Sequence, residues 1–138
     1  MARSRFVVEV LTPDGEVFNE EVEMVSTMTT VGSIGLLANH EPLLARLEPT
    51  ELRLYRSETD IVRYAQAEGY VQMSDNHALL LVEEALEPAR LNVAELSERV
   101  EAARRAHEAA PAGSEEAARA DRDRRRAEAF LAIASGAH

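Results

Sequence analysis

The chain has 138 residues, 46% of them hydrophobic, and no cysteine, which excludes disulfides, thiolate nucleophiles and cysteine-ligated zinc. Residues 1–88 carry 6 Arg against 16 acidic residues, net −10, whereas residues 89–138 carry 9 of each, net 0, so nucleic acid is a poor partner for the first part. The length predicts one core with an appendage, and the apolar runs reach only strand length, which predicts no membrane span.

Short antiparallel strands are predicted up to about residue 85. The run FVVEVL leads into TPDG, where Pro13 presets φ at the second turn position and Gly15 accepts a positive φ. Further β-favouring runs are separated by the turn signals SETD, EG and SDN. Many short strands at this spacing predict an all-β sandwich or flattened barrel. The expected strands after the second are residues 51–56, 61–67, 70–73 and 77–85.

The run at residues 16–27 alternates in polarity. Val22 and Met24 alternate with Glu21 and Glu23. Because successive side chains of a strand point to opposite faces, this pattern predicts an apolar face and a solvent-facing face of carboxylates.

The segment VGSIGLLANHEPLL, residues 31–44, suggests a phosphate loop or a catalytic elbow at first sight. It lacks the Lys and Ser/Thr of a phosphate loop, so Gly32 and Gly35 are expected to allow bends between strands, with Pro42 preorganising the next strand. His40 has no second ligand at metal spacing and is expected to hydrogen-bond its own loop. The SDNH stretch, residues 74–77, is typical of a hairpin turn, in which adjacent side chains point in different directions and cannot form a catalytic relay. We therefore expect neither a catalytic nor a metal site.

After Pro88 the apolar period becomes helical. Asn92 is a plausible N-cap, Pro111 ends the first helix, and Ser114 caps a second helix that should run to about Ala134. The first helix carries the stripe Val93, Leu96, Val100 and Ala103; the second carries Ala120, Ala127, Leu131 and Ala134, with Phe130 close to it.

Alanine dominates the apolar stripe of the second helix, so docking of this hairpin on another surface should contribute only a few kcal/mol. We therefore expect the hairpin to be a mobile or switchable element.

The polar side of the second helix is rich in charge. Arg122, Arg125 and Arg126 could meet carboxylates or phosphates of a partner. Four opposite-charge pairs are expected at i,i+4. They are Glu115–Arg119, Arg119–Asp123, Asp121–Arg125 and Arg124–Glu128.

The whole order of motifs resembles the epsilon subunit of rotary ATP synthases. The most specific part is G-x-I-G-L-L-x-x-H-x-P-L-L at residues 32–44, preceded by TPDGEVF and followed by EGYVQM and a two-helix tail. The resemblance implies a flattened antiparallel sandwich of about ten strands in residues 1–88 and an α-helical hairpin in residues 89–138.

The resemblance also implies a non-catalytic role. Epsilon joins gamma in the central stalk of the proton-translocating ATP synthase, rests on the c-ring, and inhibits ATP hydrolysis through its mobile C-terminal hairpin, which reaches the alpha and beta subunits. No cofactor is implied. The chain would then lie at the cytoplasmic face of the cell membrane, peripheral and held there through the complex.

Site residues follow from the same resemblance. The c-ring contact loop corresponds to Val31, Gly32, Ser33 and His40. The inhibitory contact with beta corresponds to Arg122, Arg124, Arg125 and Arg126. An ATP-binding motif found in some members, with ATP as a regulatory ligand, corresponds to Asp123, Arg126 and Ala127.

Three departures distinguish this chain from the family pattern. In the ring-facing loop, Ser33 stands where Glu is common and Ala38–Asn39 replace Pro–Gly. Glu68 replaces a glycine beside Gly69, and in the ATP-binding motif Arg122 replaces the usual aliphatic residue. The alternative to a rotor subunit is a stand-alone binding module in which the helical hairpin senses a nucleotide.

Overall fold

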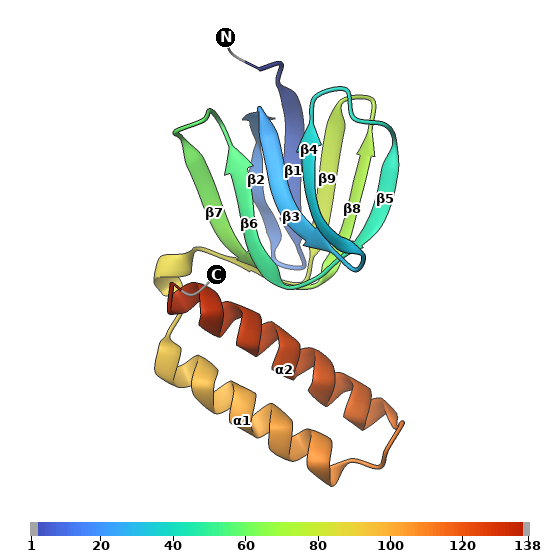
Figure 1. Cartoon of the computed structure of the whole chain (residues 1–138), viewed down its shortest axis with the longest axis vertical. Helices are drawn as coiled ribbons and strands as arrows, with labels where there is room; N and C mark the ends of the chain where they lie inside the picture. Colours follow the sequence, from blue (N-terminus) through green and yellow to red (C-terminus); the bar gives the residue numbers. More distant parts are fainter. Residues whose placement is uncertain (1–2, 137–138) are drawn as a thin grey trace. The chain divides into compact units, whose positions relative to one another are not determined.

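The computed structural model describes residues 3–136 and confirms the fold class: ten strands followed by two α-helices (Figure 1). The chain divides into two compact units, with the boundary between Glu87 and Pro88. The strands are β1 (Phe6–Thr12), β2 (Gly15–Val22), β3 (Met24–Thr29), β4 (Gly32–Leu37), β5 (Leu43–Leu47), β6 (Thr50–Tyr55), β7 (Ile61–Gln66), β8 (Gly69–Ser74), β9 (His77–Val82) and β10 (Ala85–Leu86).

The strands of the first unit follow the order β10-β7-β6-β3-β5-β8-β9-β1-β2, with β4 paired to β3 beside this path. Strand β3 links the two halves of the order, because its first residues pair with β6 while Thr29 pairs with Leu47 of β5. One pair departs from the antiparallel expectation: β1 and β9 run parallel, with Val7 opposite His77 and Leu11 opposite Leu81.

The core of this unit is apolar and draws on eight strands. It is composed of Phe6, Val8, Val10, Phe18, Val22, Val25, Leu36, Leu47, Leu52, Leu54, Val71, Met73, Ala78, Leu80 and Val82. A polar pair also lies inside: the Thr27 hydroxyl donates to Gln66 Oε1 at 2.7 Å, and Gln66 Nε2 donates to the Glu48 carbonyl at 2.8 Å. Buried polar groups must be satisfied in this way, so the pair fixes how β3 faces β7.

The predicted turns are present. Gly15 closes the β1–β2 turn with φ of 124°, as expected. Asp75 and Asn76 form the two-residue loop between β8 and β9 with φ of 48° and 61°, the geometry of a type I′ hairpin turn. Gly69 is needed for a different reason, because a Cβ there would collide with the backbone of Leu81 on β9.

The prediction for residues 16–27 was wrong in one respect. The run is divided between β2, which pairs with β1, and β3, which pairs with β4 and β6. The chain passes from one strand to the other at Glu23, whose N–H donates to the Tyr55 carbonyl at 2.7 Å. Glu23 is therefore buried, at 6% exposure, rather than part of a solvent-facing row.

The glycine prediction was half right. Gly32 has φ of 131° and lies where the β3–β4 turn ends. Gly35 has no positive φ and pairs with Ser26 inside β4, so it makes no bend. The chain turns instead at residues 38–42, where Asn39 has φ of 65°.

The second unit is a helical hairpin that follows a 3-10 turn, η1 (Pro88–Arg90). Helix α1 (Val93–Ala109) starts as predicted, because the Asn92 side chain accepts from the Glu95 N–H at 2.9 Å. Helix α2 (Glu115–Ala134) starts at Ser114, whose hydroxyl accepts from the Ala117 N–H at 3.1 Å. The expected caps and the expected end at Ala134 are confirmed.

The apolar stripes needed correction. Val93 lies at the first turn of α1 with 47% exposure, and Leu131 and Ala134 are only half-buried. The two helices pack on each other, and the buried positions are Leu96, Val100, Ala103, Ala117, Ala120, Ala127, Phe130 and Ile133. Half of these positions are alanine, and Phe130 at 0% exposure adds a large buried side chain to them.

Candidate functional site

One side of the sandwich exposes apolar side chains in neighbouring strands. On β8, Val71 and Met73 are buried, so Tyr70 and Gln72 point away from the core. Tyr70 lies between Arg46 of β5 and Leu81 of β9, and Leu81 pairs with Leu11 of β1. A second row crosses the same strands. It consists of Leu44, Gln72, Leu79 and Glu9.

We call these two rows the outer face. Leu44 is 74% exposed, Tyr70 49% and Leu81 47%. The Arg46 guanidinium lies 5.9 Å from the centroid of the Tyr70 ring and covers one edge of the apolar area. An exposed apolar area with a polar rim is typical of a protein–protein interface.

The rim carries a contact between a carboxylate and a histidine ring. Glu9 Oε2 lies 3.2 Å from His77 Nε2, and Glu9 Oε1 accepts from Asn19 Nδ2 at 3.4 Å. Beside them is a depression of about 320 Å³, lined by Glu9, Gln72, Ser74, Asp75, His77 and Leu79.

The outer face was not predicted from the sequence, although a signal was present. Residues 78–82 are apolar at every position, and a strand that is apolar on both faces is typically covered on both. Here Ala78, Leu80 and Val82 face the core, which leaves Leu79 and Leu81 on the outside.

The β3–β4 turn presents Val31, which is 95% exposed. The Thr29 hydroxyl donates to the Gly32 carbonyl at 2.9 Å and accepts from the Val31 N–H at 3.2 Å, so the turn is held from within. Ser33 follows on β4 and is exposed. The structure thus brings Val31, Gly32 and Ser33 together on one turn.

His40 does not lie on this turn, and its part in the same contact stays a prediction. It follows the other end of β4, where its N–H donates to the Leu37 carbonyl at 3.2 Å and its Nδ1 lies 2.7 Å from the Glu41 carbonyl oxygen. A six-residue strand spans about 17 Å, so a strand length separates His40 from Gly32. The expectation that His40 bonds its own loop is confirmed.

The arginines of α2 are engaged with carboxylates of the hairpin. Arg124 donates to Asp121 at 2.7 Å and to Glu128 at 3.1 Å. The hydrogen bond from Arg124 lowers the pKa of Asp121 below its usual range, and the same bond raises the pKa of Arg124. Glu128 also meets Arg104 of α1 at 3.5 Å, so this network joins the two helices.

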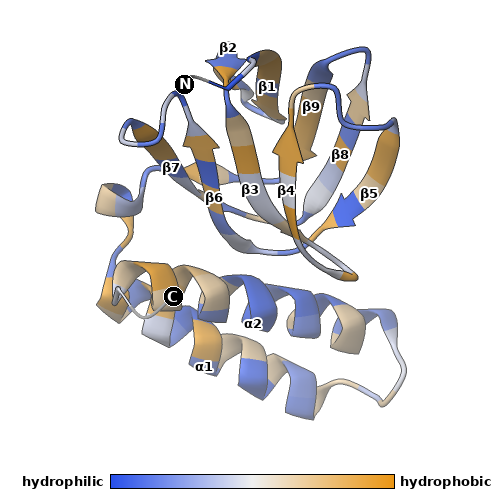
Figure 2. Cartoon of the chain, turned by 45° about the horizontal axis from the view of Figure 1, so that its top comes forward, coloured by the Kyte–Doolittle hydropathy of each residue, from blue (hydrophilic) through white to orange (hydrophobic). Residues whose placement is uncertain are grey.

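The other basic positions are more open. The side chains of Arg122 and Arg125 are 45% and 48% exposed, and Arg125 pairs with Asp121 at 3.3 Å. Two of the predicted i,i+4 pairs are therefore present, Asp121–Arg125 and Arg124–Glu128. Glu115 lies instead 3.9 Å from Arg122, two turns along the helix. The middle of α2 is its most hydrophilic stretch (Figure 2).

The three residues of the ATP-binding prediction are not equally accessible. Asp123 is exposed and Arg126 is half-buried, whereas Ala127 is 1% exposed and packs inside the hairpin. Only Asp123 and Arg126 could therefore reach a ligand, and ATP binding stays a prediction.

The comparison with protein families decides the identity of the fold. Residues 5–88 match the family model described as the ATP synthase, Delta/Epsilon chain, beta-sandwich domain. The protein is a member of the ATP synthase epsilon chain family. The resemblance inferred from the motifs is thereby confirmed.

Relatives named ATP synthase epsilon chain extend the similarity over both units. The one from Persephonella marina is 33% identical over 130 residues, covering 94% of this chain and 96% of that protein. The one from Halalkalibacterium halodurans is 36% identical over 125 residues, covering 90% and 87%. With the relative from Ligilactobacillus salivarius, 39% identity is confined to 74 residues, 54% of this chain and 53% of that one.

Solved structures show the same fold. A chain of the Euglena gracilis mitochondrial ATP synthase superposes with a TM-score of 0.78 at 18% identity, covering 100% of this chain and 84% of that chain. A chain of the Tetrahymena thermophila mitochondrial ATP synthase central stalk and c-ring gives 0.62 at 17% identity, covering 100% of both.

Two kinds of feature are absent from residues 3–136. Neither α1 nor α2 combines the length and the apolar content that crossing a bilayer requires. Within the same residues, His, Asp and Glu nowhere gather in threes that could hold a metal ion.

Proposed function

We propose that this epsilon-family chain is a non-catalytic rotor subunit in the central stalk of a proton-translocating ATP synthase, where it joins gamma to the c-ring. The observation that carries the proposal is the exposed apolar outer face on a sandwich of this family. A rotor subunit needs a rigid body with a permanent contact to the shaft. The sandwich supplies both a continuous core and an uncovered apolar face.

The gamma subunit is the proposed partner of the outer face. Burying the exposed parts of Leu44, Tyr70 and Leu81 would contribute about 1–2 kcal/mol each. Arg46 and Glu9 on the rim would set the orientation of the partner more than its affinity. This contact is expected to be stable through rotation, because it uses packed apolar side chains rather than exposed ion pairs alone.

The test is binding of the full chain to purified gamma, followed by size-exclusion chromatography. Leu81→Asp places a charge in the centre of the outer face and is expected to weaken the complex at least tenfold. Val31→Asp is the matched control, since it places the same charge at an apolar residue that is even more exposed, 95% against 47% for Leu81, but lies on the β3–β4 turn. Equal binding by wild type and Leu81→Asp would contradict the assignment of this face to gamma.

The c-ring contact is proposed for the β3–β4 turn. Val31, at 95% exposure, and the neighbouring Gly32 and Ser33 form a turn that is held by Thr29 and open to a partner. His40 would contribute to the same contact only if the ring surface reaches both ends of β4. A ring-coupling assay of Val31→Asp, with gamma binding intact, tests this part separately.

The hairpin is proposed to inhibit ATP hydrolysis through Arg122, Arg124, Arg125 and Arg126. Arg122, Arg124 and Arg125 pair with carboxylates of α2 whose side chains are 38–76% exposed, and ion pairs at the surface are worth only about 0–1 kcal/mol. The arginines can therefore exchange these partners for acidic residues of the alpha and beta subunits at little cost. The sandwich and the hairpin would act as two domains, divided near residue 88.

Removing residues 88–138 is expected to raise the ATPase rate of the assembled complex while assembly is kept. This cut is cleaner than one at residue 112, which would leave the apolar stripe of α1 without its partner α2. An unchanged rate would mean that the hairpin is not inhibitory. As a stalk subunit the chain would lie at the cytoplasmic face of the membrane, peripheral and held by the complex.

A further inference from the structure

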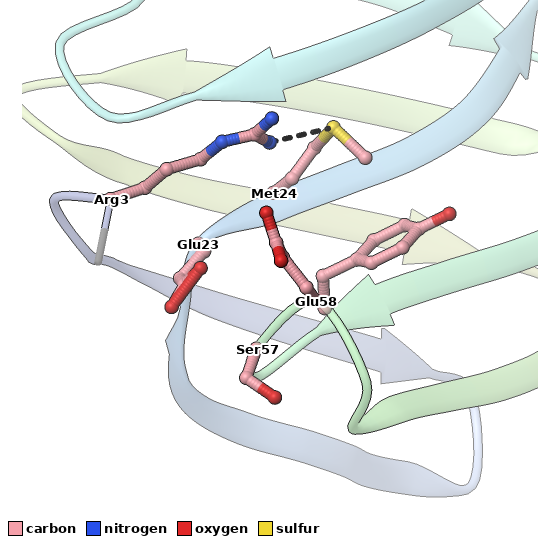
Figure 3. A pocket seen from close by; sticks show the side chains of 6 residues that line it. Arg3, Glu23, Met24, Ser57 and Glu58 are labelled. Atoms are coloured by element: carbon pink, nitrogen blue, oxygen red, sulfur yellow. Dashed lines mark hydrogen bonds between the residues drawn. The ribbon is translucent and has the colours of Figure 1, made fainter. Parts of the chain in front are cut away.

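A pocket lies at the end of the sandwich where the chain enters β1. It has a volume of about 140 Å³ and is lined by Arg3, Glu23, Met24, Tyr55, Ser57 and Glu58 (Figure 3). The lining comes from three segments: the approach to β1, the junction of β2 with β3, and the end of β6 with the loop that follows it. None of these residues belongs to the outer face or to the β3–β4 turn.

Glu23 is the unusual member. Its residue is 6% exposed and has no hydrogen bond or ion pair to another side chain within residues 3–136; its carboxylate oxygens are open to solvent through the pocket, because no fully buried side-chain oxygen in these residues lacks a partner. A buried carboxylate normally has a partner, because desolvation of an unpaired charge is costly. Glu51 shows how this fold meets that need: its side chain is also 6% exposed, and it has Arg53 at 2.6 Å and Arg63 at 3.7 Å.

The nearby guanidinium groups are directed elsewhere. Arg56 makes a bidentate pair with Glu20 at 2.9 and 2.8 Å, and the hydrogen bond from Arg56 lowers the pKa of Glu20. Arg3 points to the Met24 sulfur at 3.8 Å, and Figure 3 shows the Glu23 carboxylate directed away from it. Glu58, which is exposed, adds a second carboxylate at the rim.

The chemistry and the size of the pocket indicate its occupant. Two carboxylates suit a group with several N–H donors and a positive charge, whereas the Ser57 hydroxyl already accepts from the N–H groups of Thr59 and Asp60 at 3.3 and 3.0 Å. Small-molecule sites usually have about 300–1,000 Å³, so this volume fits the head group of one side chain better than a whole ligand. Residues 1–88, net −10, would attract a basic partner surface.

We propose that this pocket receives the guanidinium or ammonium group of a basic side chain from a partner protein, with Glu23 as its main counter-charge. The proposal rests on the proposed function only in taking that partner to be another subunit of the synthase. The pocket itself is a property of the isolated chain.

The head group can be tested with methylguanidinium chloride, titrated into the isotope-labelled full chain at constant ionic strength and followed by NMR. Saturable shifts are expected at the amides of Glu23, Ser57 and Glu58. Glu23→Gln should weaken this binding at least tenfold, whereas Glu21→Gln, the same change at an exposed position two residues away, should leave it within twofold. If Glu23→Gln does not fold, Glu58→Gln at the exposed rim replaces it.

Shifts that do not saturate, or that tetramethylammonium chloride reproduces, would overturn the proposal. So would a tenfold gain in affinity in Arg3→Gln, because it would show that Arg3 is the occupant.

The partner is tested on the purified synthase, washed with rising salt. Glu23→Gln should leave the complex at lower salt than wild type and Glu21→Gln. Equal release would overturn the partner assignment even if methylguanidinium binds. Absence of the wild-type chain from the synthase would instead refute the proposed function, and the NMR titration would still stand.

Discussion

Phe130→Ala should open the helical hairpin and leave the sandwich folded. Phe130 is 0% exposed and is the largest of the buried side chains of α1 and α2, four of which are alanine. Truncating a buried Phe costs about 3–5 kcal/mol. A core this small rarely supplies more than about 3–5 kcal/mol in total, so the loss removes most of the stability of the hairpin.

The sandwich should be unaffected, because its core cluster contains no residue beyond Val82. Hydrogen exchange followed by mass spectrometry measures both units in one experiment. Amides of α1 and α2 should lose roughly 100-fold to several-thousand-fold of their protection, at about 1.4 kcal/mol per tenfold, while strand amides keep theirs.

Val93→Ala is the control, since Val93 is 47% exposed and its truncation should cost less than about 0.5 kcal/mol. Loss of protection in sandwich and hairpin together would refute the reasoning that they hold separate cores.

Three further predictions concern local interactions. Gly69→Ala should lower the free energy of unfolding of the sandwich by at least about 1–3 kcal/mol in thermal or denaturant unfolding, because its Cβ would enter the backbone of β9; an unchanged midpoint would refute the close approach. Thr27→Val should cost about 1–3 kcal/mol, since it leaves the buried Gln66 Oε1 without its donor, and a neutral effect would mean that the amide finds another partner. The hydrogen bond from Arg124 lowers the pKa of Asp121 in the folded chain, so the pair stabilises α2 fully above the ordinary Asp pKa of about 3.9, and this contribution is lost as the pH falls through the folded pKa. Circular dichroism at 222 nm should therefore show a loss of helix in acid that is smaller in Asp121→Asn than in wild type. Equal acid titration curves for the two proteins would contradict this prediction.

Features set by neighbouring residues were predictable from the sequence. Asn92 and Ser114 cap their helices because an N-cap needs only a side-chain oxygen and the N–H groups three residues on. Gly15 and the Asp75–Asn76 turn follow equally from local φ preferences. The family was recognised from the motif at residues 32–44. The departures from the family pattern at Ser33 and Asn39 lie at opposite ends of β4.

Features set by pairing between distant strands were not predictable. In the sequence, Glu23 belongs to an alternating row of carboxylates, which predicts that it faces solvent. It is buried because the chain passes from β2 to β3 at this residue. The outer face depends on the registers that place Leu44, Tyr70 and Leu81 on one side, which no local pattern specifies. His40 and Val31 are nine residues apart in the sequence, and strand β4 between them keeps them apart in space.

The central claim is that this chain is a stalk subunit, and the most direct test is its stoichiometry in the purified enzyme. ATP synthase isolated through a tag on its beta subunit should contain this chain in a one-to-one ratio with gamma by quantitative mass spectrometry, and the two should leave the complex together when it is dissociated. An active synthase that contains gamma but lacks this chain would contradict the account.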